Sequence, residues 1–456
     1  MVVKGFEKIV KSANEDAVNK IVQSHPVLVG IQKAIDVIPG MHENLFLHSG
    51  PPIEWKRMCG PVRGAVLGAV VYESLAGSLE EAEMVVDSGR IAFSPTHHHD
   101  CVAPMAGIIS PSMPVYVVKN RTFNNVAYSN VNEGVGKVKT LRFGANNEEV
   151  ISRLKWIEHT LAPALKSALE ISGEIDLRSI IAESLRRGDE CHNRNKAATS
   201  SFLQQVINPL LETDLEKSSM ASIVEFINGN PHFFLNLSMA SSKATMDAAR
   251  NIEYSTIVTI MATNGVDFGI QVSGLANEWF TAPAPKQARG KIFDEYSPDD
   301  ANPVFGDSYI SEPAGIGAFA MAASPAIAEF VGGTPSYGVK MTKQMAKICV
   351  ARHEFYKIPY LDYIGTPVGI DLRRVLKTGI VPVVNTGLGH KNPGVGQVGA
   401  GIAYAPMLCF KKAAKAYGKK YHKKLSSSKR KCYELAGFHQ HLIVHLYFRN
   451  HLLHRH

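Results

Sequence analysis

Residues 148–171, EEVISRLKWIEHTLAPALKSALEI, carry apolar side chains every three or four positions. Ile151, Leu154 and Leu161 would therefore lie on one face of a helix, because residues three and four apart are neighbours on a helix surface. The surrounding chain keeps the same composition, rich in Leu, Ile, Ala, Glu and Lys and poor in glycine. This pattern predicts a mainly helical region over residues 146–251.

Short apolar runs separated by glycine-rich turns flank this helical region on both sides. Upstream, residues 64–72 read GAVLGAVVY and residues 113–118 read MPVYVV; downstream, residues 254–274 read YSTIVTIMATNGVDFGIQVSG and residues 377–387 read KTGIVPVVNTG. Short β-branched runs bounded by Gly and Pro are typical of strands mixed with helices. The sequence therefore predicts an α/β (α+β) fold, with two α/β domains and the helical domain between or beside them.

Changes in composition divide the chain into four parts. They are an N-terminal α/β domain (residues 1–145), a helical domain (146–251), a C-terminal α/β domain (252–410) and a basic, histidine-rich tail (411–456). With 456 residues, 45% of them hydrophobic, the chain is long enough for two or three domains with buried cores. Near the start, residues 14–40 are predicted to form a helix with Asn14 as its N-cap, since two acidic residues follow in the first turn.

The formal charge of +8 comes from the end of the chain. Residues 411–456 contain nine Lys and three Arg against one Glu, whereas the preceding residues contain 37 basic and 40 acidic side chains. The folded part is therefore nearly neutral, and we expect no binding to nucleic acid. Six His lie in residues 439–456, HQHLIVHLYFRNHLLHRH. This stretch is either a nickel- or zinc-binding segment or a non-native extension, and the function is inferred without it.

Cysteine spacing and hydropathy predict a cytoplasmic protein. The six Cys are far apart and form no C-x-x-C pair, which is typical of reduced thiols in a cytosol. Lys and Glu interrupt the apolar residues near the start, so no secretory signal is visible. The uncharged stretch 313–328 has 16 residues, fewer than the roughly 20 that span a bilayer, and we expect no membrane insertion.

The first candidate for chemistry is residues 94–107, SPTHHHDCVAPMAG. Three consecutive imidazoles beside a carboxylate and a thiol can supply a general acid, a general base or metal ligands. In an extended segment His97 and His99 would face one side and His98 the other. A polar loop with hydrogen-bonded histidines is the alternative. No H-E-x-x-H or paired C-x-x-C motif completes a zinc site, so no metal is predicted.

The second candidate is residues 186–199, RRGDECHNRNKAAT, which cross a helix break. A helix that began near His192 would align four polar side chains on one face: His192, Asn195, Lys196 and Thr199. That face, together with the neighbouring arginines, could bind an anion. The alternative is a solvated helix junction with ordinary surface ion pairs, each of which contributes little stability.

The third candidate is residues 390–401, HKNPGVGQVGAG, in which Gly394, Gly396 and Gly399 match G-x-G-x-x-G. As a dinucleotide fingerprint the match is weak, because the preceding strand candidate ends too far upstream and no acidic residue follows at about 20 positions. Glycines still let backbone N–H groups approach a phosphate closely, especially beside Lys391 and a helix N-terminus. No P-loop motif is present, so an ATPase is not predicted.

Seven blocks in a fixed order carry a resemblance that no single motif carries. They are MHENLFLHSGPPIEW (41–55), CGPVRGA (59–65), HHHDCVAPMAGIISPSMPV (97–115), RRGDECHNRNKAAT (186–199), NPHFFLNLSMASSKA (230–244), MATNGVDFGIQ (261–271) and NTGLGHKNPGVGQVGAGIA (385–403). Together they resemble the AllG-like family of oxamate carbamoyltransferase subunits. The resemblance covers about residues 10–410 and ends before the histidine-rich tail.

The resemblance implies a three-part body and a role in anaerobic allantoin (purine) catabolism. In that pathway an assembly of three different subunits converts oxalurate and phosphate to oxamate and carbamoyl phosphate, from which a carbamate kinase makes ATP. Family membership alone does not say which subunit carries the chemistry. The expected partners are therefore the other subunits, a small anionic substrate and phosphate, with a second copy of the chain as a further candidate.

The residue types suit phosphorolysis of a ureido carbonyl. This reaction brings together phosphate, a substrate carboxylate and a developing oxyanion, so it needs cationic or N–H donors and an acid for the leaving nitrogen, but no covalent nucleophile or cofactor. The candidate acids are His97, His99 and His192. The candidate groups for binding the substrate and phosphate are Arg63, Arg187, Arg194, Lys196, Lys391, Gly394, Gly396 and Gly399.

Two other functions stay open. As a non-catalytic partner, the chain would dock an acyl-CoA-synthetase-like subunit and expose a large apolar patch. As a metal-dependent amidohydrolase, it would bring at least three ligands from the HHHD segment and His42, His48 or His192 to one point.

Overall fold

Helix α1 (Val2–Gln23) leads directly into strand β1 (Pro26–Lys33). The helix predicted over residues 14–40 is therefore wrong at both ends. Asn14 is not an N-cap but a buried residue inside α1, and its side chain is hydrogen-bonded within the core. Because Pro26 has no N–H group and its ring clashes with a preceding helical turn, the chain leaves the helix before this residue.

The computed structural model describes residues 2–134 and 138–436. Residues up to Ala414 form one compact unit, and residues from Lys415 onward form a second one, which is described only as part of a helix that ends at Ala436. The histidine-rich stretch, with the metal-binding and non-native interpretations given to it, lies outside the described residues.

Helices and strands alternate along the described chain. The α-helices are α1 (Val2–Gln23), α2 (Ala34–Val37), α3 (Gly60–Tyr72), α4 (Leu79–Asp87), α5 (Glu148–Trp156), α6 (Ala162–Ser172), α7 (Leu177–Arg186), α8 (Lys196–Leu211), α9 (Lys217–Gly229), α10 (Leu235–Ala248), α11 (Pro325–Phe330), α12 (Pro335–Met345), α13 (Leu372–Thr378) and α14 (Met407–Ala436). The short 3-10 helices are η1 (Trp55–Arg57), η2 (Thr96–His99), η3 (Leu141–Phe143), η5 (Ser273–Leu275), η6 (Pro298–Asp300), η7 (Ser308–Ile310), η8 (Gly317–Ala323) and η9 (Pro359–Leu361), and η4 (Ile157–Leu161) is a π-helical turn.

The strands form several small sheets. They are β1 (Pro26–Lys33), β2 (Leu45–His48), β3 (Ala92–Pro95), β4 (Pro114–Asn120), β5 (Val126–Asn130), β6 (Ile175–Asp176), β7 (Val258–Asn264), β8 (Asp267–Val272), β9 (Phe280–Pro283), β10 (Arg289–Ile292), β11 (Phe305–Gly306), β12 (Cys349–Ile358), β13 (Ile364–Ile370), β14 (Val383–Gly389) and β15 (Gln397–Tyr404). The sheet orders are β5-β4-β1-β6, β10-β15-β14, β11-β7-β8-β9, β12-β13 and β2-β3, and only the last of these pairs is parallel. The fold is thus mixed α/β, as predicted.

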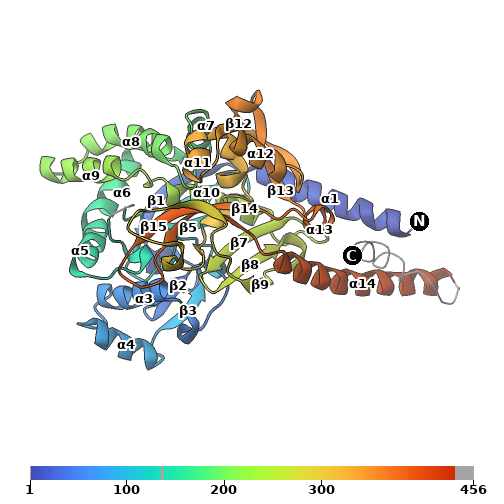
Figure 1. The fold of residues 1–456 in the computed structure, drawn as a ribbon, viewed down its shortest axis with the longest axis horizontal. Coiled ribbons are helices and arrows are strands. Elements are labelled where there is room, and N and C mark those ends of the chain that lie inside the picture. The colour runs from blue at the N-terminus through green and yellow to red at the C-terminus, as the bar shows by residue number, and fades with distance from the viewer. Residues whose placement is uncertain (1, 135–137, 437–456) are drawn as a thin grey trace. The chain divides into compact units, whose positions relative to one another are not determined.

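The sheet β5-β4-β1-β6 and the helices around it (Figure 1) contribute most side chains of an extensive buried core. Helix α10 packs on β4 and β5, and α6 and α7 pack on β1. Helix α10 is buried along most of its length although it is rich in Asn, Ser, Thr and Lys. Because buried polar side chains need hydrogen-bond partners, this helix must face polar groups of neighbouring segments.

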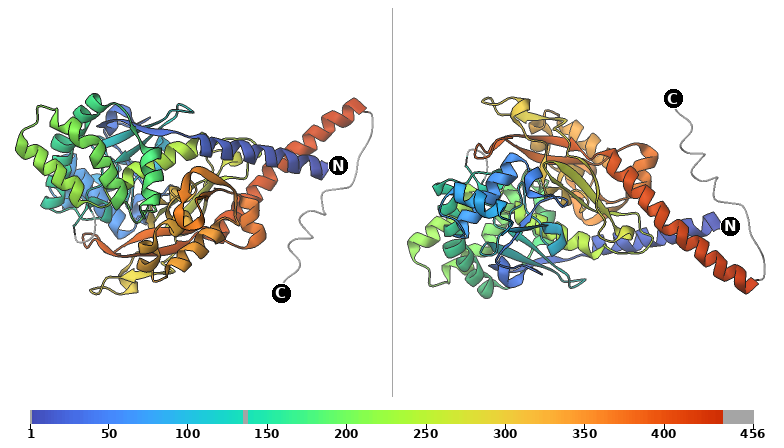
Figure 2. Two further views of the ribbon diagram at one scale, coloured as in Figure 1. Left: turned by 90° about the horizontal axis from the view of Figure 1, so that it is seen from above. Right: turned by 90° about the horizontal axis from the view of Figure 1, so that it is seen from below.

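The chain between Glu148 and Ala248 is mainly helical, interrupted by β6. The amphipathic stretch 148–171 forms α5 and α6, joined by η4, and its Leu154 and Leu161 side chains are buried as predicted. These helices and the sheets of the C-terminal half lie on different sides of the first unit (Figure 2, green against yellow and orange). Strand β6 nevertheless pairs with β1, so the helical region shares a sheet with the N-terminal region. The domain boundaries at residues 145, 251 and 410 stay a prediction.

The apolar run at residues 64–72 is part of a helix, α3, and not of a strand. A Cβ atom at Gly64 would lie 2.4 Å from the carbonyl oxygen of Gly144, so glycine is required where α3 approaches the chain near η3. The run at residues 113–118 does form β4, and residues 254–274 form β7 and β8. Tertiary packing of small residues, rather than strand propensity, decides the conformation of α3.

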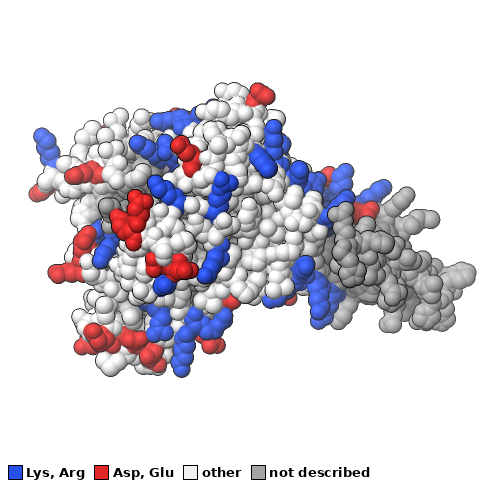
Figure 3. All heavy atoms as spheres, viewed as in Figure 1, with Lys and Arg blue, Asp and Glu red and all other residues white. Residues whose placement is uncertain are grey.

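Charged side chains of both signs are interspersed over the described face of the molecule in Figure 3. This distribution agrees with the near balance of acidic and basic residues before residue 411. Within the described ranges, no helix has the length and apolar character to cross a membrane. The uncharged stretch 313–328 includes η8 and the start of α11, both short.

Candidate active site

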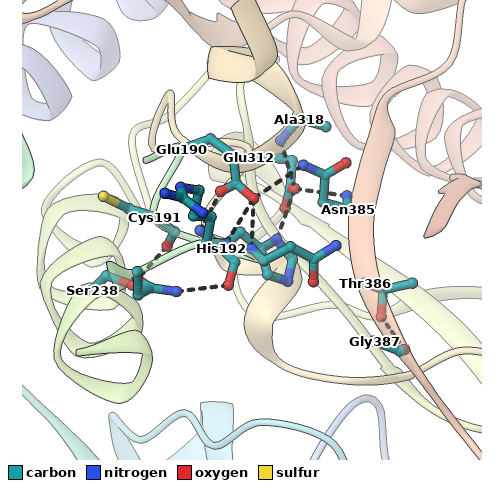
Figure 4. A network of polar contacts seen from close by, with 12 residues as sticks. Glu190, Cys191, His192, Ser238, Glu312, Ala318, Asn385, Thr386 and Gly387 are labelled. Carbon is teal, nitrogen blue, oxygen red and sulfur yellow. Dashed lines mark hydrogen bonds and ion pairs between the residues drawn. The ribbon is translucent and has the colours of Figure 1, made fainter. Parts of the chain in front are cut away.

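A buried network of polar side chains surrounds His192 (Figure 4). His192 and Glu190 lie in the loop between α7 and α8, Glu312 follows η7, and Asn385 lies on β14. All four side chains belong to residues at most 2% exposed, although they come from three segments far apart in the sequence. Burying two carboxyl groups together is unfavourable unless each is hydrogen-bonded, so such a site needs a dense set of donors.

Side-chain and backbone donors hold both carboxylates. Nδ1–H of His192 donates to Glu312 Oε1 at 2.9 Å, and the backbone N–H groups of Asn385 and Ala318 donate to the same oxygen at 3.1 Å each. Glu190 accepts the backbone N–H of His192 at 2.6 Å. The side-chain amide of Asn385 donates to Glu190 at 3.4 Å and so links the two carboxylates.

Gly317 lets the segment after η7 approach the His192 loop closely. Its φ of 63° lies in the left-handed region, and a Cβ atom there would stand 2.4 Å from Glu312 Oε1 and 3.2 Å from His192 Cβ. The backbone N–H of Gly317 also donates to the carbonyl of Glu190 at 2.7 Å. A side chain at this position would therefore push Glu312 away from the imidazole.

The protonation of this network follows from burial and from the two carboxylates. Burial raises the pKa of Glu190 to about 7, although His192 and the backbone donors act in the opposite direction. For His192, burial lowers the pKa, but the charge and hydrogen bond of Glu312 outweigh it and the net pKa is raised. The raised pKa favours the imidazolium form of His192, in which Nδ1 is held by Glu312 and Nε2 lies outside that hydrogen bond. The arrangement can supply a general acid.

Asparagine side chains form a second layer beside the network. The amide of Asn230 donates to the backbone carbonyl of Asn132 at 3.0 Å, and the amide of Asn132 donates to Asn236 Oδ1 on α10 at 3.0 Å. Ser238, two residues further along α10, donates to the carbonyl of Cys191 at 2.9 Å. Helix α10 therefore places its polar side chains against both the His192 loop and the segment after β5.

Arg142 and His232 border the network on this side. His232 Nε2–H donates to the carbonyl of Asn193 at 2.7 Å, and the Arg142 guanidinium donates to the carbonyl of Gly134. Burial, together with the charges of Arg142 and His192, lowers the pKa of His232 to about 3. His232 is therefore neutral and lies within electrostatic reach of both cations.

The histidines predicted as acids lie in separate places. The HHHD segment forms η2 and is not extended, so the prediction of His97 and His99 on a common face is wrong. His97 is fully buried, with Nε2 3.5 Å from Asp307 Oδ1, whereas His99 donates from Nδ1 to the carbonyl of Pro39 at 2.6 Å. Within the described chain, no hydrogen bond or ion pair joins either residue to the His192 network, and their catalytic role stays a prediction.

The predicted anion-binding arginines have local ion-pair partners. Arg63 pairs with Glu83 at 2.8 Å, Arg187 with Glu183 at 3.4 Å, and Arg194 with Asp189 at 3.2 Å. Lys196 is exposed at the first position of α8. Helix α8 begins there, so the predicted helix starting near His192 is wrong, and Lys196 and Thr199 do not share a helix face with the imidazole. Substrate binding by these cations stays a prediction.

The glycine motif lies in and after the turn between β14 and β15, which is a strand-turn-strand arrangement. Gly394 and Gly396 lie in the turn, with φ values of 79° and 109°. Gly399 lies in β15, opposite Leu388 of β14. Lys391 Nζ donates to the carbonyl of Asp299 at 2.9 Å. The turn touches the start of α3, since a Cβ atom at Gly60 would lie 2.4 Å from the carbonyl oxygen of Lys391. A phosphate cradle at this turn stays a prediction.

Metal ligation was the second alternative for the HHHD segment. Among the residues that the structure describes, no three His, Cys, Asp or Glu side chains are placed to hold a common ion. His48 is buried, and burial lowers its pKa to about 4. The amidohydrolase alternative required at least three ligands converging on one point, and the described residues contain no such group.

Four residues of the network were missed in the sequence. His232 and Asn385 lie within two of the seven blocks quoted above, so their blocks were noticed but not their side chains. Glu312, in SEPAGIG, and Arg142, in LRFGA, carry only the weak signal of a charged residue beside glycine. No periodicity or spacing connects them with His192.

Comparison with known proteins assigns the family. A family model described as oxamate carbamoyltransferase subunit AllG matches residues 91–308. The protein named oxamate carbamoyltransferase subunit AllG from Escherichia coli (strain K12) is 41% identical over 410 residues, which is 89% of this chain and 97% of that protein. The chain belongs to the AllG family, which confirms the resemblance carried by the seven blocks.

Two further relatives support this assignment. An uncharacterised protein from Escherichia coli (strain K12), YahG, is 46% identical over 412 residues, covering 90% of this chain and 87% of that protein. A crystal structure of a conserved protein of unknown function from Enterococcus faecalis V583 superimposes with a TM-score of 0.88 at 44% identity. It covers 90% of this chain and 98% of that one. The fold is therefore shared along 90% of this chain.

Proposed function

We propose that the chain is a subunit of an oxamate carbamoyltransferase-like complex in anaerobic allantoin and purine catabolism. The complex would convert oxalurate and phosphate into oxamate and carbamoyl phosphate. The observation that carries the proposal is the 41% identity to a protein named as subunit AllG along 97% of its length. The buried His192 network supports it, because phosphorolysis needs a proton donor for the leaving nitrogen.

The proposed reaction requires one bond to form and one to break. A phosphate oxygen bonds to the ureido carbonyl carbon, and the bond from that carbon to the inner nitrogen breaks. The leaving nitrogen takes a proton from Nε2 of His192 and departs as the amide of oxamate. The proton carried by phosphate then returns to the imidazole, so the site is regenerated. Glu312 holds the imidazolium in place throughout.

The test measures carbamoyl phosphate made from oxalurate and phosphate by the purified chain, with and without the other subunits of the complex. We expect His192→Asn to lower the rate at least about 100-fold, the usual contribution of a positioned general acid. His159→Asn is the matched control, because the His159 side chain is 65% exposed on η4. Full activity of His192→Asn, or no product from the wild-type complex, would contradict the proposal.

The second candidate function is that of a non-catalytic partner subunit. It is favoured by apolar side chains exposed on the β12–β13 hairpin, where Tyr360 is 65% and Tyr363 58% exposed. Aromatic residues are enriched in protein interfaces. In this case the assembled complex would keep its rate in the His192→Asn variant, whereas substituting Tyr360 and Tyr363 by Ser would prevent assembly.

A further inference from the structure

Arg142 is a buried cation with few partners. The residue is 5% exposed on η3, and its Nε has no hydrogen-bond partner. Among the described residues, no carboxylate oxygen lies within 4.0 Å of the guanidinium. The Glu133 carboxylate attracts it from further away, while Glu133 itself accepts the backbone N–H groups of Leu141 and Arg142. A buried guanidinium without a paired anion is unfavourable, which is typical of a site that binds one.

A continuous series of contacts connects Arg142 with the His192 loop. Arg142 donates to the carbonyl of Gly134, whose own N–H donates to Asn132 Oδ1 at 3.1 Å. Asn230 donates to Asn132, and His232, two residues later, donates to the loop next to His192. The charges of Arg142 and His192 both act on the ring of His232, so the two side chains lie near the same buried residue.

Several buried polar atoms around His192 also lack a hydrogen-bond partner, among them the donor Asn193 Nδ2 and three acceptors. Glu312 Oε2, Asn385 Oδ1 and Asn195 Oδ1 are buried, and each is without a hydrogen-bond partner. All three are acceptors, so their natural complement is a group that offers N–H donors. Buried acceptors left unpaired are unfavourable, and several at one place are typical of a site that a ligand completes.

We propose that this region binds a small amidic acid, with its carboxylate on Arg142 and its terminal NH₂ group on Glu312 and Asn385. The proposal rests on the proposed function and adds to it an orientation for oxamate, whose NH₂ nitrogen is the leaving nitrogen of the proposed reaction. One guanidinium matches one carboxylate bidentately. The neighbouring His232 is neutral, so the charge at this end suits a monoanion better than phosphate.

Three ligands of similar size test the carboxylate end and the NH₂ end of the site separately. Oxamate carries both groups, pyruvate replaces the NH₂ by a methyl group, and oxamide replaces the carboxylate by a second amide. Isothermal titration of the full-length wild-type protein should show oxamate binding at least about 10-fold more tightly than either analogue. Equal affinities for the three ligands, or no binding of oxamate, would overturn the proposal.

Variants then assign each end to a residue. Arg142→Gln should weaken oxamate and pyruvate at least about 10-fold and leave oxamide within about twofold. Arg121→Gln is the matched control, because Arg121 is an exposed arginine paired with Glu174 and lies outside the network. Glu312→Gln should weaken oxamate and oxamide but spare pyruvate. Equal losses for oxamate and oxamide in Arg142→Gln would overturn the assignment of the carboxylate.

Two further arms keep the result decisive. Circular dichroism shows whether Arg142→Gln folds. If it does not, Arg142→Lys replaces it, because this variant keeps the charge but loses the bidentate geometry. Arg142→Lys should weaken the binding of oxamate and pyruvate more than the binding of oxamide. Inorganic phosphate is titrated alongside, and a loss of phosphate binding with unchanged oxamate binding in the Arg142 variant would overturn the proposal. Arg142-dependent oxamate binding without carbamoyl phosphate formation would leave the inference standing and contradict the proposed function.

Discussion

Two buried histidines of this protein face buried carboxylates, yet their surroundings shift their pKa values in opposite directions. His192 donates to Glu312 at 2.9 Å, whereas His97 Nε2 lies 3.5 Å from Asp307 and neither of its ring nitrogens has a hydrogen-bond partner. The net pKa of His192 is raised, because Glu312 outweighs burial. Burial and the charge of Lys243 lower the pKa of His97.

The difference lies in what each carboxylate is bound to. Asp307 accepts Thr96 Oγ1–H at 2.5 Å, the Gly50 N–H at 2.8 Å and the Ala103 N–H at 3.1 Å, so it ties three segments together. Glu312 also accepts backbone groups, but its shortest contact is with the imidazole. Asp307 therefore stabilises the fold, because its hydrogen bonds join three segments. Glu312 instead favours the protonated form of His192.

The largest difference in catalytic rate is expected between variants of Glu312 and variants of Asp307. In the reconstituted complex we expect Glu312→Gln to lower carbamoyl phosphate formation about 100- to 1,000-fold, because a neutral amide no longer favours the imidazolium of His192. Asp307→Asn should keep the rate within about 10-fold. Parallel losses in both variants, at equal thermal stability, would remove the distinction between the two pairs.

The free energy of unfolding should depend more on Asp307 than on Glu312. Asp307→Ala leaves three buried donors without an acceptor and should lower the free energy of unfolding by about 4 kcal/mol, in the range for breaking a buried polar network. Chemical denaturation followed by circular dichroism measures this change. Asp307→Asn, which keeps one acceptor oxygen, serves as the milder control. A loss below about 1 kcal/mol for the alanine variant would show that the three donors do not depend on Asp307.

The pH dependence of stability should reveal Glu190. Its pKa is about 7 when folded, against an ordinary value of 4.5, so the folded state holds the proton more tightly than the unfolded chain. Stability is then fully present below pH 4.5 and is lost as the pH rises to 7, by on the order of 3 kcal/mol at most. Denaturation at several pH values should show this decline in the wild type and a shallower one in Glu190→Gln. Equal slopes would contradict the raised pKa.

Gly317 tests how closely the two segments of the network must approach. A methyl group there would overlap Glu312 Oε1 and would strain a left-handed backbone, so Gly317→Ala should lower stability by about 2 kcal/mol. The matched control is Gly394→Ala, which has a comparable positive φ but open space around its Cα. If both variants lost the same stability, backbone strain alone would explain the effect.

The smallest effect is expected for a surface ion pair. Arg63→Ala removes the pair with Glu83 and the stacking of the guanidinium 4.2 Å from the centre of the Trp55 ring. Because these groups are partly exposed, the free energy of unfolding should fall by only about 1 kcal/mol. Chemical denaturation measures this change from the shift of the midpoint. A much larger loss of activity than of stability would instead support the predicted role of Arg63 in substrate binding.

Much of the fold could be predicted from local patterns. The helical stretch at residues 148–171 and the strands β4 and β14 follow from periodicity and β-branched composition. The start of the chain could not, because Asn14 is held by Thr256 and Asp371, partners more than 240 residues away. Likewise, the glycines of α3 are explained by its approach to Gly144, which no local pattern records.

The candidate site was predicted only in part, for a similar reason. His192 was singled out because of its charged and polar neighbours, but the partner that sets its pKa, Glu312, lies 120 residues away. The HHHD segment looked more reactive in the sequence, and the structure shows that Asp307 uses its hydrogen bonds to anchor that segment. Burial and long-range pairing, which decide protonation, are not visible in a single sequence.

The protonation of the two histidines tests the central claim most directly. Imidazole ¹⁵N chemical shifts of histidine-labelled protein at pH 7.4, assigned with His192→Asn and His97→Asn, distinguish an imidazolium from a neutral ring. The account predicts that His192 is protonated at both nitrogens and loses this state in Glu312→Gln, while His97 is neutral. A neutral His192 in the wild-type protein, or two histidines with the same signature, would contradict it.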